Sequence, residues 1–142
     1  RCDPDLSCRK TGKLIGTTAQ GKYEAIQWLM FQMSGVGPMF GQLGFFYKFA
    51  GASMEDPTAR DRFVAEAKRL LNVVENQLEG RDWITGEYSI ADIALAPWLN
   101  ALDYYGAKEV VGWDDYKNAV AYLARFMERP AVQRGKNIPD PG

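Results

Sequence analysis

The sequence contains no histidine and only two cysteines, and both shortages limit the chemistry available to the chain. Histidine is the commonest general base near neutral pH and the commonest metal ligand, so no histidine-dependent chemistry is expected. A zinc site needs about four Cys, His or carboxylate ligands at fixed spacing, and none is visible, so we expect no metal. Cys2 and Cys8 lie near the start of the chain, either as free thiols in a solvated tail or as a disulfide closing a short loop.

The chain also lacks an excess of charge and a long hydrophobic run. It has 17 Lys and Arg against 18 Asp and Glu, a net charge of −1, whereas nucleic-acid binding needs a basic surplus. No apolar run approaches the roughly 20 residues of a membrane helix, and no charged-then-apolar leader is present. We expect no nucleic-acid or membrane partner, and a cytoplasmic location, because the cysteine-free remainder suits a reducing compartment.

The sequence shows helical periodicity, and its length fits a single domain. Its 142 residues are 46% hydrophobic and 25% charged, which is typical of a globular domain. From Lys22 apolar residues recur at helical spacing, and Pro38 predicts a kink in a helix that continues to about Phe49. Residues 50–57 are expected to form a loop.

Further helices follow this loop. The pair Asp56-Pro57 is typical of a helix start, and one apolar stripe then runs to Gly80. Another helix is expected at about 114–128, with Tyr116, Val120, Leu123 and Met127 facing inward, and a short turn after Pro130. With no repeat and no strand alternation, the prediction is an all-α bundle of about five helices.

The stretch "YSIADIALAPWL" (88–99) is an apolar helical run that opens with Ser89 and carries Asp92 as its only charge. Serine followed three residues later by an acid has the form of a capping box, in which each side chain accepts a hydrogen bond from the other residue's amide. A helix that starts inside the protein needs this, because burial leaves its first amides without water. We interpret Ser89 and Asp92 as structural; a catalytic Asp92 would need a partner acid, and only Glu87 is near.

Two features suggest a binding site. The run "GPMFGQLGFFYKF" (37–49) carries more aromatic residues than one buried helix face absorbs. Either they divide between the core and ordinary surface, or some of them face a ligand cleft or a subunit interface. Gln42 and Tyr47 could orient a ligand there, and Lys48 could meet a carboxylate. Arg62 lies near the start of its helix, where a cation opposes the helix dipole, which indicates either a solvated side chain or a carboxylate partner.

Three stretches together resemble the C-terminal helical domain of glutathione transferases: "IQWLMFQMSGVGPMFGQ", "AKRLLNVVENQLEGRDWITGEYSIADIALAPW" and "ERPAVQRG". Within that superfamily they are most similar to the bacterial nu-class enzymes and their fungal nitrogen-regulator-like relatives. The resemblance covers residues 10–138, leaving 1–9 as an atypical segment and 139–142 as a tail.

The resemblance implies a helical domain that shapes the acceptor-substrate pocket beside a thioredoxin-like domain that holds glutathione. It implies a cytoplasmic homodimer formed through the first two long helices, with a detoxifying role, acting on glutathione and a small electrophilic or disulfide substrate. Arg62, in "DRF", corresponds to an arginine that contacts glutathione, and Gln42 lines the same cleft. Phe45, Phe46, Tyr47 and Trp98 become pocket or interface residues.

The thioredoxin-like domain and its Glu-Ser pair are absent from this sequence, which departs from the family pattern. We therefore assign no catalytic residue to this chain and expect it to be inactive alone; the complete protein would conjugate glutathione to electrophiles or reduce disulfides or peroxides. In this group glutathione itself performs the thiol chemistry, so neither cysteine is expected to be a redox centre. The alternative is a non-catalytic protein-interaction or regulatory domain derived from the same fold.

Overall fold

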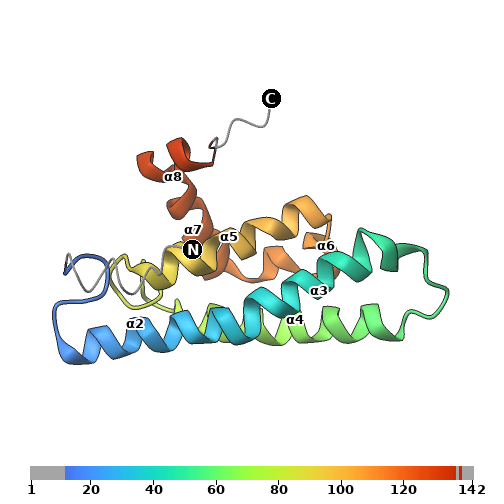
Figure 1. Ribbon diagram of the computed structural model, residues 1–142, viewed down its shortest axis with the longest axis horizontal. Coiled ribbons are helices and arrows are strands. Elements are labelled where there is room, and N and C mark those ends of the chain that lie inside the picture. The colour runs from blue at the N-terminus through green and yellow to red at the C-terminus, as the bar shows by residue number, and fades with distance from the viewer. Residues whose placement is uncertain (1–11, 137, 139–142) are drawn as a thin grey trace.

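The structure is a computed structural model that describes residues 12–136 and 138, so the predictions for Cys2, Cys8 and the two terminal segments lie outside the described residues. Within the described part of the chain every regular element is a helix, and the predicted all-α class is confirmed (Figure 1). None of the described helices is both long enough and apolar enough to cross a membrane.

The longest rod of the bundle is one interrupted helix, made of α2 (Ala19–Phe31), the π-helical turn η1 (Gln32–Val36) and α3 (Gly37–Tyr47). Pro38 lies in the first turn of α3, as predicted. A proline has no amide to donate to the preceding turn, and the amide of Gly37 instead donates to the carbonyl of Gln32, five residues back. The interruption is thus a π-helical turn, and α3 ends at Tyr47, slightly before the predicted limit.

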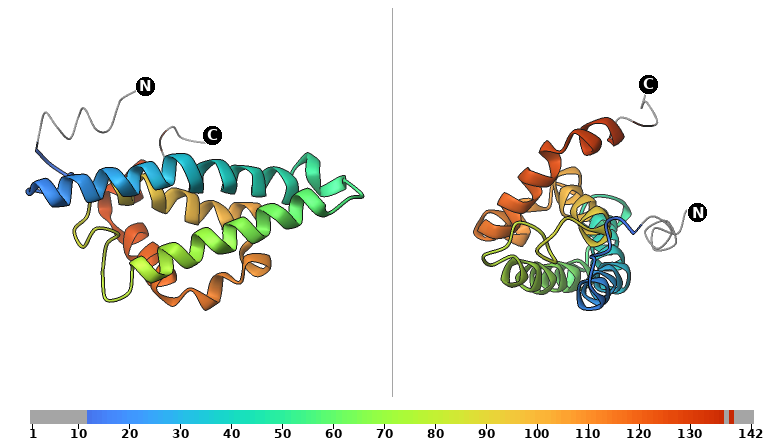
Figure 2. Two further views of the ribbon diagram at one scale, coloured as in Figure 1. Left: turned by 90° about the horizontal axis from the view of Figure 1, so that it is seen from below. Right: turned by 90° about the vertical axis from the view of Figure 1, so that its left-hand side faces the viewer.

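The helix α4 (Thr58–Gln77) runs back along α3 after a loop that contains the short 3₁₀ turn η2 (Ala50–Ser53) (Figure 2). Asp56 prepares its start, because one carboxylate oxygen accepts from the Thr58 amide at 2.9 Å and from the Thr58 hydroxyl at 2.6 Å. These two bonds lower the pKa of Asp56. The predicted start of this helix at the Asp-Pro pair is therefore correct.

The helix α5 (Ile90–Tyr105) fills the centre of the molecule against the glycine-bearing side of α3. A Cβ added at Gly44 would lie 2.5 Å from the Tyr105 ring, and one added at Gly37 would lie 3.4 Å from the Trp98 ring. The approach at Gly44 leaves no room for a Cβ, so this glycine lets the Tyr105 ring of α5 pack directly on the backbone of α3. At Gly37 the tightest contact of an added Cβ would be the Gln32 side-chain amide, at 2.9 Å.

The remaining elements are α6 (Lys108–Val111), the 3₁₀ turn η3 (Trp113–Asp115), α7 (Lys117–Glu128) and α8 (Pro130–Gly135). The start of α7 is capped from a distance: the Glu75 carboxylate on α4 accepts from the amides of Asn118 at 3.0 Å and Ala119 at 2.9 Å. After Arg129, α8 turns away from the bundle and projects beyond α5 (Figures 1 and 2).

The buried side of α7 is wider than the sequence stripe suggested. Tyr116 and Leu123 are buried as predicted, whereas Val120 and Met127 are only partly buried. The side chains of Ala119, Tyr122 and Phe126 are buried as well. Tyr122 packs edge-on against Trp83, with ring centroids 6.1 Å apart, because α7 contacts the loop before α5 as well as α4.

Candidate functional site

Arg62 lines a cavity of about 480 Å³ between α3 and α4, on the side away from α5. Apolar groups form part of its wall: Met39 comes from α3, and Phe63 stacks on Phe46 with ring centroids 5.3 Å apart. Among the described residues no carboxylate lies within ion-pair distance of Arg62, whose side chain is exposed. A guanidinium with free donors beside an apolar wall is suited to a ligand that carries a carboxylate and a hydrophobic part.

Two further charged residues of α4 line the same cavity. Arg69 donates to both carboxylate oxygens of Glu66, at 2.8 Å from Nε and 2.7 Å from Nη2. The hydrogen bond from Arg69 lowers the pKa of Glu66, and the nearby charges of Arg69 and Arg62 lower it further. This pair therefore neutralises itself, and Arg62 carries the cavity's unmatched positive charge.

Gln42 and Phe46 lie on the same side of α3 as this cavity. Met39, Gln42 and Phe46 are spaced i, i+3, i+7, which places them along one face of the helix. Gln42 is exposed, and Phe45 is 44% exposed with its ring edge-on to Phe46 at 5.0 Å. The predicted residues Arg62, Gln42, Phe45 and Phe46 thus come from adjacent parts of two packed helices.

Trp98 and Tyr47 belong to different surroundings. Trp98 is partly buried on α5 and lies over Gly37 and Gly41, on the opposite side of α3 from Met39. Tyr47 is partly buried against the core. The terminal amine of Lys48 donates to the Tyr104 carbonyl and lies 3.7 Å from the centre of its ring. The structure therefore does not bring Trp98 next to Arg62.

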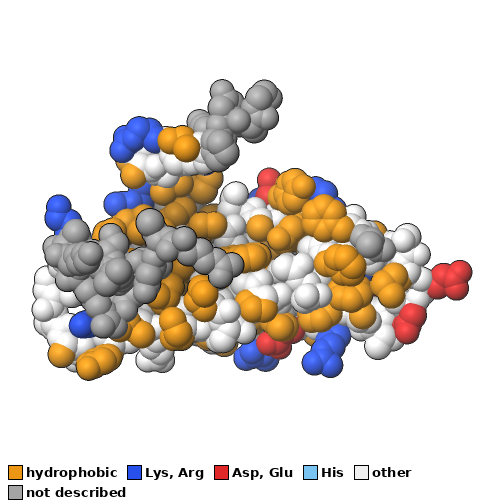
Figure 3. All heavy atoms as spheres, viewed as in Figure 1, with side chains coloured by type: hydrophobic (Ala, Val, Ile, Leu, Met, Phe, Trp, Pro, Cys, Tyr) orange, Lys and Arg blue, Asp and Glu red, His pale blue; other side chains and the backbone are white. Residues whose placement is uncertain are grey.

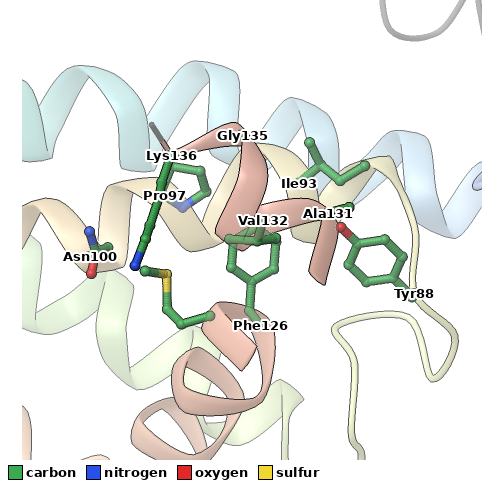
Figure 4. A pocket seen from close by; sticks show the side chains of 10 residues that line it. Tyr88, Ile93, Pro97, Asn100, Phe126, Ala131, Val132, Gly135 and Lys136 are labelled. Carbon is green, nitrogen blue, oxygen red and sulfur yellow. The ribbon is translucent and has the colours of Figure 1, made fainter. Parts of the chain in front are cut away.

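A second, mainly apolar groove of about 470 Å³ lies between α5, α7 and α8 (Figure 4). Figure 4 shows the Phe126 ring pointing toward Val132 of α8, with Pro97 and Ile93 of α5 to either side in this view. Asn100 faces Lys136 at one end of the groove, and the Tyr88 hydroxyl lies near Ala131 at the other. The residues that line it are Tyr88, Ile93, Pro97, Asn100, Phe126, Met127, Ala131, Val132, Gly135 and Lys136.

Ser89 and Asp92 form a capping box at the start of α5. The Asp92 carboxylate is fully buried and accepts from the amides of Ser89 at 2.8 Å and Ile84 at 3.0 Å. Burial raises the pKa of Asp92, and the hydrogen bonds oppose that shift only in part. With both oxygens directed at backbone amides, Asp92 fixes the loop 84–89 to the helix and is not open to a substrate.

The sequence singled out Arg62 as a candidate but not the other residues that line its cavity. Met39, Phe63, Glu66 and Arg69 complete the cavity, and the available signal was the spacing R-x-x-x-E-x-x-R, which aligns three charged residues on one helix face. Within the part of the chain that the structure describes, no group of three or more His, Cys, Asp or Glu could hold a metal ion.

The fold is a helical bundle, and comparisons with known proteins specify its family. Residues 57–125 match the family model described as the C-terminal domain of glutathione S-transferase. The Escherichia coli protein named disulfide-bond oxidoreductase YghU is 36% identical, covering 91% of this chain and 46% of YghU. The E. coli protein named disulfide-bond oxidoreductase YfcG is 41% identical, covering 87% of this chain and 55% of YfcG.

Solved structures agree. A glutathione transferase from Burkholderia graminis, with two glutathione molecules bound per subunit, is 58% identical, with a TM-score of 0.91 over 95% of this chain and 57% of that one. One from Pseudomonas putida, with one glutathione disulfide bound per subunit, is 48% identical, with a TM-score of 0.93 over 98% of this chain and 60% of that one. This chain is a C-terminal helical domain of the glutathione transferase family, and it spans about half the length of the curated relatives it matches.

Proposed function

We propose that this chain is the helical part of a glutathione transferase and that Arg62 binds a carboxylate of glutathione. The observation that supports this most strongly is the unpaired Arg62 guanidinium in the α3–α4 cavity, beside the apolar side chains of Met39 and Phe63. A bidentate arginine–carboxylate pair supplies orientation as well as affinity. Gln42, on the same side of α3, would add a hydrogen bond to the bound peptide. No metal is needed for this binding.

The reaction we favour is reduction of a disulfide by glutathione. Two relatives are named disulfide-bond oxidoreductases, and the Pseudomonas neighbour was solved with glutathione disulfide. In this reaction two glutathione thiols are oxidised to one glutathione disulfide while the substrate disulfide gains two electrons and two protons to give two thiols. This chain would bind and orient the reactants; conjugation to a small electrophile, with a detoxifying role in the cytoplasm, would use the same site.

We also propose a homodimer that uses the outer face of α2, η1 and α3. No Asp, Glu, Lys or Arg occurs from Ala25 to Tyr47, and Met30 and Met33 on this rod are 51% and 60% exposed. A charge-free surface helix with exposed apolar side chains is typical of an interface. Figure 3 shows hydrophobic side chains spread over this face of the molecule. Met39 and Gln42 would place the Arg62 cavity at the border of that interface.

The apolar groove between α5, α7 and α8 is a second surface that another domain or protein would cover. The thioredoxin-like domain that the resemblance implies would cover Ile93 and Val132 there. The same groove favours the alternative function, a non-catalytic interaction domain that binds another protein in that place. Light scattering over a dilution series tests both surfaces: dimers are expected, and a chain that stays monomeric at every concentration contradicts the proposed interface.

Enzyme assays test the proposed function. The complete protein that contains this chain should reduce bis(hydroxyethyl) disulfide with glutathione faster than it conjugates chlorodinitrobenzene, and this chain alone should do neither. Arg62→Ala should lower kcat/KM for glutathione at least about tenfold, because a hydrogen bond to a charged group contributes about 1.5–3 kcal/mol. Arg60→Ala, a matched loss of charge on α4, should change little. Unchanged turnover in Arg62→Ala would contradict the role of this residue.

A further inference from the structure

Three charged residues share one face of α4: Arg62, Glu66 and Arg69, spaced i, i+4, i+7. All three line the α3–α4 cavity. Figure 3 shows basic and acidic side chains next to each other along the lower edge of the molecule, where α4 runs. Glu66 lies between two cations and pairs with only one of them, Arg69, through both carboxylate oxygens.

Helix geometry explains this choice. A glutamate pairs better with a cation that follows it than with one that precedes it, because that order also suits the helix dipole. Arg69 follows Glu66 by three residues, whereas Arg62 precedes it by four. The charge of Arg62 nevertheless acts on Glu66, since it contributes to the lowered pKa of that carboxyl. If Arg69 were removed, Arg62 would therefore be the cation on this face of α4 with which Glu66 could pair.

We propose that Arg69 is a positioning residue that keeps Arg62 free for a ligand carboxylate by holding Glu66 away from it. Glu66 is then a competitor for the incoming carboxylate, and it is neutralised by Arg69 in the folded protein. This inference rests on the proposed role of Arg62 in glutathione binding. It assigns to Arg69 an effect on affinity without any contact between Arg69 and the ligand.

The proposal predicts a loss of affinity for one substitution, no loss for a conservative one, and a rescue in a double variant. Arg69→Met frees Glu66 to pair with Arg62 and should weaken glutathione binding about two- to fivefold, the factor that an exposed ion pair supplies. Arg69→Lys, which can still hold Glu66, should stay close to the original affinity. The double variant Glu66→Gln/Arg69→Met has no competitor and should recover the original affinity, although it carries one substitution more.

The binding experiment is a calorimetric titration of the complete protein with reduced glutathione, for the three variants and a control. Arg60→Met removes a cation from the opposite side of α4, where Arg60 pairs with Asp61 at 3.4 Å, and it should not change the affinity. Circular dichroism checks that each variant remains helical. If Arg69→Met binds as tightly as the original protein, or if the double variant does not recover, the inference is wrong.

A second measurement does not depend on glutathione. Phenylglyoxal modifies arginines that have free guanidinium groups, and peptide mass spectrometry reports the rate at Arg62. The rate should fall in Arg69→Met and return in the double variant; an unchanged rate overturns the inference. If the original protein binds no glutathione while the rates behave as expected, the proposed function fails and the arrangement of the three residues stands.

Discussion

Removing the Asp92 carboxylate should destabilise the fold strongly, because this side chain is fully buried and holds two backbone amides. In Asp92→Ala the amides of Ser89 and Ile84, now 2.8 Å and 3.0 Å from carboxylate oxygens, lose their acceptors. Each buried donor left without a partner costs about 1–3 kcal/mol, so the two together cost about 2–6 kcal/mol. Burying the charged carboxylate has its own cost, which places the expected loss in the lower half of that range, at about 3 kcal/mol.

The assay is urea unfolding followed by far-UV circular dichroism at neutral pH. Asp92→Asn keeps one acceptor oxygen but points its own NH2 group at the other backbone amide. Its free energy of unfolding should therefore lie between those of the original protein and Asp92→Ala. Asp103→Ala is the matched control, since Asp103 lies on the same helix with an exposed side chain paired to Lys108 at 2.8 Å. Such a pair is worth about 0–1 kcal/mol. Equal unfolding midpoints for Asp92→Ala and Asp103→Ala would refute the reasoning.

The same carboxylate gives a pH dependence with a defined sign. Burial raises the pKa of Asp92 in the folded protein above its ordinary value of 3.8. The stability that protonated Asp92 contributes is fully present below that ordinary value and is lost as the pH rises through the folded value. As the pH rises from 3.8 through the raised pKa of folded Asp92, the original protein should therefore lose stability relative to Asp92→Asn. The lowered pKa values of Asp56 and Glu66 act in the opposite direction in both proteins and cancel in the difference.

Two further substitutions test the packing that holds the site. Gly44→Ala would place a methyl group 2.5 Å from the Tyr105 ring and should cost about 1–3 kcal/mol, measured by urea unfolding. Gly41→Ala in the same helix meets its nearest atom at 3.9 Å and should be neutral or stabilising; the reverse order would contradict the close α3–α5 contact. Glu75→Ala removes the cap of α7 and should cost about 1–2 kcal/mol in the same assay, whereas the exposed Glu79→Ala should change little.

Local signals in the sequence were sufficient for most of the helices. The Asp-Pro pair, Pro38 and the Ser89–Asp92 box act within one helical turn, and each lies where the sequence indicated. The short α6 and η3 elements span too few residues to show periodicity. The cap of α7 by Glu75 joins residues more than forty positions apart, and no local pattern reports such a contact.

In the candidate site, too, local signals could be read from the sequence and long-range contacts could not. Arg62 could be selected because its position opposes the helix dipole and because the family resemblance points to it. Its neighbours on α3 could not, since only the packing of α3 against α4 places Met39 beside it. Trp98 was predicted as a pocket or interface residue, and the structure places its ring over Gly37 and Gly41, on the other side of α3 from Met39.

Direct binding is the most informative measurement for the account as a whole. Reduced glutathione is titrated into the complete protein, into Arg62→Ala and into Arg62→Lys, and the dissociation constants are compared at two salt concentrations. The account predicts binding about 10- to 150-fold weaker in Arg62→Ala, partial recovery with lysine, and a smaller salt dependence once the charge is removed. Equal affinity and equal salt dependence in all three proteins would show that the guanidinium of Arg62 does not contact glutathione.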